Sequence, residues 1–183
     1  MGRPAILLAA PAWKEMTFMS GGVIHPASVG YGYPSLVIDR ELLMAIEQHL
    51  HAAGCRYGLG AKAPSLDCDT SAIHAIDCSG FVRYALYRAS GVDIGDGSVQ
   101  QHDGIELRGF KHSTVADAGR RDGAVRIAFL SPAAGRGIGH VMLVLDGETI
   151  ESHGGVGPDR RVWDAERYPF MGECAVYVLA PPR

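Results

Sequence analysis

The chain has 183 residues, which is long enough for one domain with a proper hydrophobic core, and a formal net charge of −3. Because the charge is nearly balanced and no basic run occurs, we do not expect a nucleic acid as a partner. No apolar stretch is long enough to span a membrane, and the four cysteines are too few and too scattered for a disulfide scaffold.

Residues 1–38 differ in character from the rest of the chain. The apolar run at residues 5–10 is short, follows a single basic residue and is bounded by Pro4 and Pro11, which favours a strand or packed extension over an export signal. Glycines and prolines recur between residues 20 and 34, where we expect irregular chain. We therefore expect an extension over residues 1–38 and a single folded domain over residues 39–183.

A first amphipathic helix is predicted over residues 39–53. Asp39 is a suitable N-cap, and Leu43, Ile46 and Leu50 fall on one face of the helix. A glycine directly after the run ends it. This helix is expected to pack its apolar face on the core.

The segment that follows reads as a loop, with one proline and two aspartates in residues 61–75. Cys55, Cys68 and His74 lie in this part of the chain, but their spacing is not that of a known metal site. A surface loop is the favoured interpretation. Whether Cys55 and Cys68 form a disulfide depends on whether the protein is exported, and the sequence leaves this open.

The stretch over residues 76–84 places a cysteine at the start of a helix. Ser79 and Gly80 allow a tight turn, and the apolar residues that follow recur with helical spacing until Gly91. Cys78 is then expected at the helix N-terminus, where free backbone N–H groups and the macrodipole favour an anion. The thiolate is the reactive form of cysteine, and the same N–H groups can hold an oxyanion. A buried structural cysteine is the alternative.

The second half of the chain predicts strands. In residues 124–129 the large apolar residues Val125, Ile127 and Phe129 alternate with alanine or arginine, and Asp146-Gly147 between two further runs is a strong hairpin signal. The glycine-rich residues 91–123 indicate no clear element. The expected strands cover residues 124–129, 140–145, 148–153 and 175–179.

The two-residue turn also fixes a register for this hairpin. Leu145 opposes Glu148, and counting back along both strands brings His140 opposite His153. Directly opposed residues share a face, with Cβ atoms about 4.5–5.5 Å apart. The two imidazoles are therefore predicted to touch, provided that no bulge shifts the register.

These residues suit acyl transfer through a cysteine. One imidazole takes the proton of the thiol and returns it to the leaving amine, and a third polar group holds that imidazole in place. We assign Cys78 as the nucleophile, His140 as the base and His153 as the orienting residue. A zinc site made of the same three residues is the lesser alternative, because nothing indicates a fourth ligand.

The motifs Asp77-Cys78-Ser79-Gly80-Phe81-Val82, Gly139-His140-Val141 and Glu151-Ser152-His153-Gly154-Gly155 resemble those of the NlpC/P60 cysteine peptidases. The resemblance runs from about Asp39 to the C-terminus. It implies an α+β, papain-like fold, in which the cysteine lies on a helix packed against an antiparallel sheet that carries both histidines. It also implies hydrolysis of peptidoglycan stem peptides, often between D-γ-glutamate and a diamino acid, with no cofactor and no metal.

The resemblance also implies roles for further residues. Asp77 and Ser79 match positions that bind the free amine of a stem peptide, and Tyr57 resembles a tyrosine that borders the oxyanion site. Residues 61–75 separate Tyr57 from Cys78 by more than the family pattern does, so a packed turn tyrosine is the alternative. Asp77 is also a candidate helix cap.

Three functional classes remain open at this level. The first is a peptidoglycan endopeptidase or amidase, the second an acyltransferase that works through a Cys78 thioester, and the third an inert cell-wall binding module. We expect peptidoglycan or a muropeptide as the partner, and action at the bacterial cell wall or periplasm. Delivery by a phage or a secretion system would fit a chain without a clear signal peptide.

Overall fold

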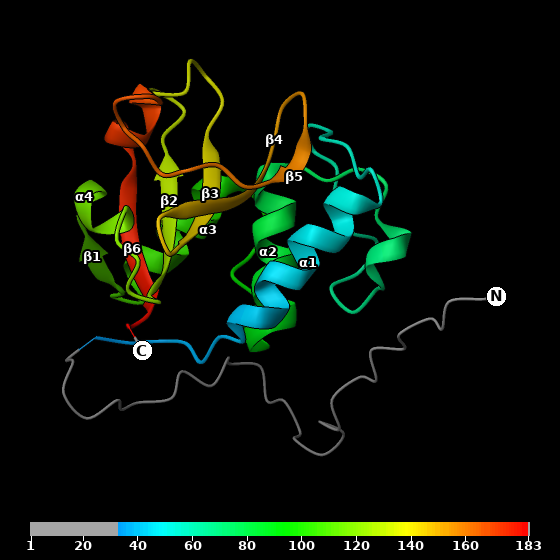
Figure 1. Cartoon of the computed structure of the whole chain (residues 1–183), viewed down its shortest axis with the longest axis horizontal. Coiled ribbons are helices and arrows are strands. Elements are labelled where there is room, and N and C mark those ends of the chain that lie inside the picture. The colour runs from blue at the N-terminus through cyan, green and yellow to red at the C-terminus, as the bar shows by residue number, and fades with distance from the viewer. Residues whose placement is uncertain (1–32, 183) are drawn as a thin grey trace.

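A six-stranded antiparallel sheet forms the centre of the protein (Figure 1). The structure is a computed structural model that describes residues 33–182. The predictions for residues 1–32, including the apolar run, lie outside the described residues. The strands follow the order β1-β6-β2-β3-β4-β5, with bounds β1 Lys111–Ser113, β2 Val125–Leu130, β3 His140–Leu145, β4 Glu148–His153, β5 Gly157–Asp159 and β6 Ala175–Ala180.

Four α-helices and two short 3₁₀ helices accompany the sheet in the described residues. Helices α1 and α2 pack against each other and against the β3–β5 side of the sheet, as Figure 1 shows. The α+β class expected from the sequence is confirmed. The helices are α1 Arg40–Ala52, α2 Cys78–Ser90, α3 Ser98–Leu107 and α4 Val115–Ala118, with 3₁₀ helices η1 Thr70–Ala72 and η2 Pro169–Glu173.

The predicted helix of residues 39–53 is confirmed as α1. The Asp39 side chain accepts a hydrogen bond of 2.9 Å from the Leu42 N–H, which satisfies one of the free donors at the helix start. Leu43, Ile46 and Leu50 are buried, as the apolar spacing predicted. The amphipathic pattern therefore sufficed to place this helix.

The sheet separates two hydrophobic cores. The larger core lies between the sheet and the helices, and α2 contributes most of its buried face there, including Phe81, Val82 and Leu86. The smaller core lies on the other face, where Met142 and Val176 pack with the residues around α4 and η2. Alternating side chains along each strand supply both cores, which is why β2 is buried along its whole length.

The predicted hairpin between β3 and β4 is confirmed, including its turn. Asp146 and Gly147 both have positive φ angles, 51° and 75°, as a type I′ turn requires. A Cβ atom at Gly147 would lie 2.7 Å from the Gly119 carbonyl oxygen, so glycine is needed here for space as well as for conformation.

Residues 91–123, for which the sequence indicated no clear element, contain α3, β1 and α4. Only Gln101 and Ile105 of α3 are buried. The helix therefore has almost no apolar face, and its sequence shows no amphipathic pattern that would predict it. Strand β1 has three residues and an exposed pattern. Tertiary contacts rather than local patterning therefore decide the structure of this segment. In residues 33–182 no helix is long and apolar enough to cross a membrane.

Candidate active site

Cys78 is the first residue of α2, as the sequence predicted. Asp77 is the N-cap, and its Oδ1 accepts a hydrogen bond of 2.7 Å from the Gly80 N–H. The helix ends at Gly91, whose φ of 74° is left-handed. The Cys78 side chain therefore lies at the positive end of a 13-residue helix, and the residue is only 6% exposed.

His140 is the first residue of β3, and its ring contacts two groups. Its Nε2–H donates to Glu151 Oε2 over 2.6 Å. Burial lowers the pKa of His140, but hydrogen bonding with Cys78 and Glu151 and the charges of both outweigh this and raise the pKa to about 9. The imidazole therefore lies between the sulfur and a carboxylate, with Nε2 on the side of the carboxylate.

Glu151 is fully buried and holds the imidazole from β4. Its Oε1 accepts hydrogen bonds from the Thr149 hydroxyl at 2.6 Å and from the Arg161 guanidinium at 2.8 and 3.0 Å. Burial raises the pKa of Glu151, but the hydrogen bond and charge of His140, together with Arg161 and Thr149, lower it to about 2. Glu151 is therefore an anion whose oxygens are both occupied by donors.

Arg161 is itself held in place. Its guanidinium carbon lies 5.3 Å from the ring centroids of both Tyr168 and Phe170. These contacts fix the direction from which Arg161 reaches Glu151. The candidate nucleophile is thus the first member of a chain of contacts from Cys78 through His140 and Glu151 to Arg161.

The predicted pairing of His140 with His153 is wrong. The β3–β4 ladder contains the predicted pairs from Leu145↔Glu148 to Leu143↔Ile150, but from Glu151 onwards β4 pairs with β5. His153 Nε2 lies 3.4 Å from Asp159 Oδ2, and its Nδ1 lies 3.3 Å from the Gly154 carbonyl oxygen. The orienting contact assigned to His153 is therefore made by Glu151.

The β3–β4 ladder ends at Ile150, and the end of β4 has contacts elsewhere in the fold. Its last three residues pair with β5, and the Ser152 hydroxyl donates to the Ile76 carbonyl oxygen over 2.8 Å. Ile76 precedes the cap of α2, so this buried hydrogen bond ties β4 to the helix that carries Cys78.

Tyr57 also reaches the sulfur. Burial, and then the charges of Cys78 and Asp77 and hydrogen bonding with Cys78, raise the pKa of Tyr57. The backbone around Tyr57 is held by a bridge between Arg56 and Ala75. The structure therefore brings together Cys78, His140 and Tyr57, although the loop of residues 61–75 separates Tyr57 from Cys78 in the chain.

Asp77 and Ser79, which the resemblance assigns to a substrate amine, are occupied by a side chain of the protein itself. Lys62 Nζ lies 2.7 and 2.6 Å from the two carboxylate oxygens of Asp77 and 2.8 Å from Ser79 Oγ. Asp77 also caps α2, as the sequence suggested. A substrate amine would meet an ammonium already bound at these two residues.

Sequence reasoning missed Glu151 and Lys62, and also Arg161, which binds Glu151. Strand alternation contained a signal for Glu151. Thr149 opposes Val144 across the hairpin, so both lie on the same face of the sheet. Residues two or four positions along the same strands, Glu151 and His140, lie on that face as well. Glu151 is therefore a diagonal neighbour of His140, within reach of a long side chain. No local pattern indicated Lys62, since only the folded loop brings it to Asp77.

The alternative metal sites have no counterpart in residues 33–182, where no group of three or more His, Cys, Asp and Glu side chains could hold a metal ion. Cys55, Cys68, Cys78 and Cys174 are free thiols, and Cys55 is buried. A Cys55–Cys68 disulfide is thus not present in this structure.

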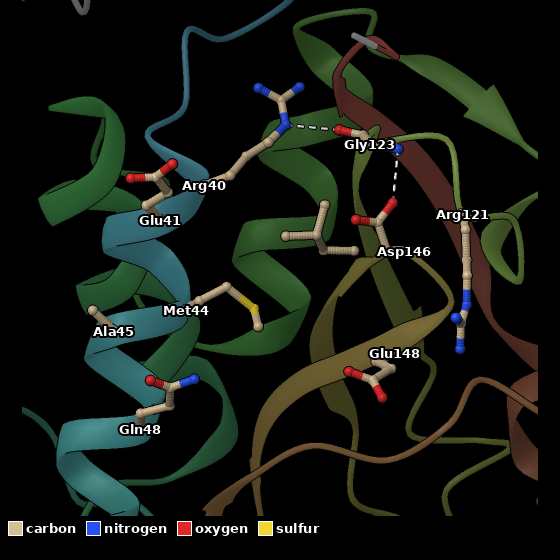
Figure 2. Close-up of a pocket in the computed structure, with 10 residues that line it drawn as sticks. Arg40, Glu41, Met44, Ala45, Gln48, Arg121, Gly123, Asp146 and Glu148 are labelled. Atoms are coloured by element: carbon tan, nitrogen blue, oxygen red, sulfur yellow. Dashed lines mark hydrogen bonds between the residues drawn. The ribbon is translucent and has the colours of Figure 1, made fainter.

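A cleft of about 730 Å³ lies away from these residues, between the start of α1 and the turn of the β3–β4 hairpin (Figure 2). Arg40, Met44, Asp146 and Glu148 are among its lining residues, and neither Cys78 nor His140 is. Figure 2 shows Arg40 donating to the Gly123 carbonyl oxygen at the edge of the cleft. This cleft lies near the end of α2 opposite Cys78, since the N–H of Asp39 bonds to the Ala89 carbonyl oxygen there.

Comparison with known proteins gives a family and a fold. The model of the NlpC/P60 family matches residues 54–159, which is more than half of the chain. A crystal structure of the NlpC/p60 domain of the peptidoglycan hydrolase SagA is similar to this chain, with a TM-score of 0.50 and 23% sequence identity. The match covers 76% of this chain and 98% of that chain, and it indicates a shared fold. Among curated proteins, none matches this sequence.

Proposed function

Because the chain belongs to the NlpC/P60 family, we propose that it is a cysteine hydrolase that cleaves amide bonds in the stem peptides of bacterial peptidoglycan. One observation carries this proposal: the ring of His140 lies between Cys78, at the start of α2, and the buried carboxylate of Glu151. This is the arrangement of a nucleophile, a base and an orienting group.

In this mechanism the side chains of the protein carry the proton. Nε2 of His140 donates to Glu151, so Nδ1 faces the sulfur. Because the pKa of His140 is raised to about 9, this nitrogen holds the proton while the Cys78 sulfur reacts as the thiolate. The thiolate attacks the carbonyl carbon, and His140 returns the proton to the leaving nitrogen as the C–N bond breaks. A water molecule then attacks the thioester and gives a proton to His140, and hydrolysis releases a carboxylic acid and restores the thiol.

The oxyanion of each tetrahedral intermediate has donors in reach of the sulfur. Asp77 uses the Gly80 N–H as its capping partner, and the first N–H groups of a helix have no intrahelical acceptor. Those at Cys78 and Ser79 therefore point from the start of α2, where the macrodipole is positive. The Tyr57 hydroxyl beside the sulfur is a further donor.

The bond between D-γ-glutamate and a diamino acid is the one that we assign, and the support for it is the resemblance of the motifs around Cys78, His140 and His153. We place the activity at the bacterial cell wall or periplasm on the same ground. Neither assignment enters the geometric argument for the nucleophile and the base.

Purified muropeptides provide the direct test. We expect the protein to cleave them, with each new carboxyl group carrying one oxygen from heavy-oxygen water in the mass spectrum. Cys78→Ala should give no product while its circular dichroism spectrum stays native. Normal turnover by Cys78→Ala would overturn the mechanism. Products that carry an added amine in place of the water oxygen would show acyl transfer instead of hydrolysis.

A further inference from the structure

The ammonium group of Lys62 lies in a polar pocket beside the nucleophile. Lys62 Nζ contacts both carboxylate oxygens of Asp77, Ser79 Oγ at 2.8 Å and Asp96 Oδ1 at 3.2 Å. Asp77 and Ser79 are the immediate chain neighbours of Cys78. The positive charge is therefore held by residues that flank the sulfur, on a side chain that is 29% exposed.

The Asp77 carboxylate also has hydrogen-bond donors other than Lys62. The Asp77 carboxylate is buried and also accepts the Gly80 N–H, the Gly60 N–H at 3.0 Å and the Ser79 hydroxyl at 3.1 Å. These donors are neutral, so they fix the orientation of the Asp77 carboxylate and leave its negative charge uncompensated. A buried carboxylate needs a cation to compensate its loss of solvation, so the pocket has the chemistry of an ammonium site.

The chain also leaves space for the lysine stem. A Cβ atom at Gly80 would lie 2.8 Å from Lys62 Cδ and 3.0 Å from the Ala61 carbonyl oxygen, so only glycine admits the lysine at this distance. The backbone beside Lys62 is tied to the helix start, because the Asp77 N–H donates to the Ala61 carbonyl oxygen over 2.9 Å. Lys62 is thus delivered to the pocket by a loop anchored one residue away.

We propose that Lys62 is a built-in occupant of an ammonium site, and that the enzyme therefore acts on stem peptides whose amino end is acylated. This inference rests on the proposed function. A free α-ammonium of a released peptide would have to displace Lys62 or bind next to its like charge. An amide-linked amino end, as in peptidoglycan whose peptides remain joined to the glycan, carries no charge and needs no carboxylate.

A purely structural role for Lys62 is the competing explanation, and stability alone does not separate the two. Loss of the ammonium would weaken the loop in either case. Only the proposal requires that the choice between free and acylated substrates changes when the ammonium is removed. The ratio of two kcat/KM values is therefore the decisive measurement.

The experiment uses one stem peptide in two forms, with a free amino terminus and with an acetylated one. We expect the wild-type protein to cleave the acetylated form at least as efficiently as the free form. In Lys62→Met, which keeps the aliphatic stem, the empty carboxylate should accept the free amine, and the preference should shift toward the free form by tenfold or more. Lys111→Met, on the distant strand β1, is the matched control and should keep the wild-type ratio.

Each outcome decides something different. A wild-type preference of tenfold or more for the free amine would overturn the inference and leave the proposed function intact. An equal ratio of the two kcat/KM values in wild type and Lys62→Met would overturn the inference and leave Lys62 with a structural role in the loop. If Lys62→Met does not fold, the wild-type ratio alone decides whether the inference holds. Failure of the wild-type protein to cleave either form would instead count against the proposed function.

Discussion

At the scale of single residues, the pair His140–Glu151 determines how the imidazole is held. A buried carboxylate is costly unless donors and opposite charges surround it, and Glu151 has His140, Thr149 and Arg161 as partners. Oε1 of Glu151 accepts from Thr149 and Arg161, which leaves Oε2 to His140. The orientation of the ring therefore depends on Glu151, and through it on Arg161.

Substitution separates the orienting residue seen in the structure from the one suggested by the sequence. We expect Glu151→Gln to lower kcat by about 100-fold, because a neutral amide stabilises the imidazolium poorly and can favour the wrong tautomer. His153→Gln should stay within about threefold of wild type, since its ring contacts Asp159 and the Gly154 carbonyl instead. Steady-state kinetics on one muropeptide measure both variants, and the reverse order would restore His153 as the orienting residue.

The pH dependence of stability follows from the same pair. The pKa of His140 is raised from 6.5 to about 9, so the folded protein holds a proton that the unfolded chain has lost between these values. The stabilisation is fully present below pH 6.5 and is lost as the pH rises through about 9. Urea unfolding should show a decrease on the order of 2 kcal/mol in the free energy of unfolding across this window.

Glu151→Gln provides the control for this titration. Without the carboxylate the raised pKa of His140 loses one of its main causes, so the decrease between pH 6.5 and 9 should become much smaller. An equally steep decrease in Glu151→Gln would show that other groups produce the pH dependence.

At the scale of elements, the site depends on how α2 and the β3–β4 hairpin are joined. Asp77 caps the helix, and Ser152 of β4 bonds to the Ile76 carbonyl just before that cap. The hairpin turn at Asp146-Gly147 lies at the other end of the strands and sets the register of the first three pairs. One end of the hairpin thus carries the chemistry, and the other end fixes the alignment.

The hairpin turn gives a stability prediction. Gly147→Ala places a Cβ atom at a φ of 75° and within 2.7 Å of the Gly119 carbonyl oxygen, so we expect a loss of about 1–3 kcal/mol in the free energy of unfolding. Gly154→Ala, where φ is not left-handed and nothing lies within 4 Å, should be nearly neutral. Thermal unfolding of both variants measures the difference, and equal stabilities would contradict the turn assignment.

At the scale of the whole molecule, the sheet lies between the core that holds the nucleophile and the core on which the residues that orient its base are packed. Helix α2 packs on the larger core, and its buried residues hold Cys78 at a fixed position relative to β3. The smaller core joins the opposite face to the region around α4 and η2. The position of the sulfur depends directly on the larger core, whereas Tyr168 and Phe170, which hold Arg161, pack against the smaller one.

Two identical substitutions test this division. Val82 lies one helical turn after Cys78 in the larger core, and Val176 lies on β6 in the smaller core. Val82→Ala and Val176→Ala should each lower the free energy of unfolding by about 2 kcal/mol, because both leave a similar cavity. Val82→Ala should lower kcat/KM by about tenfold, since small displacements of a nucleophile are costly. Val176→Ala should lower it much less, because strand β2 separates β6 from β3, which carries His140. An equal loss of activity in both variants would contradict this expectation.

The sequence by itself determined the local structure and the positions of Cys78 and His140 at the starts of a helix and a strand. Apolar spacing and caps located α1 and α2, the Asp-Gly pair located the β3–β4 turn, and the motif around Cys78 placed it at a helix start. These features depend on neighbours within a few residues, where capping, turn conformation and helical period act directly.

Only the tertiary structure decided which residues complete the site. The sequence register continued the hairpin to His153, but the β3–β4 ladder ends at Ile150, and the carboxylate that binds His140 belongs to its diagonal neighbour Glu151. Lys62 reaches Asp77 through a folded loop that no period describes. Such contacts depend on how segments far apart in the chain pack together, and the spacing of residues within one segment does not determine that packing.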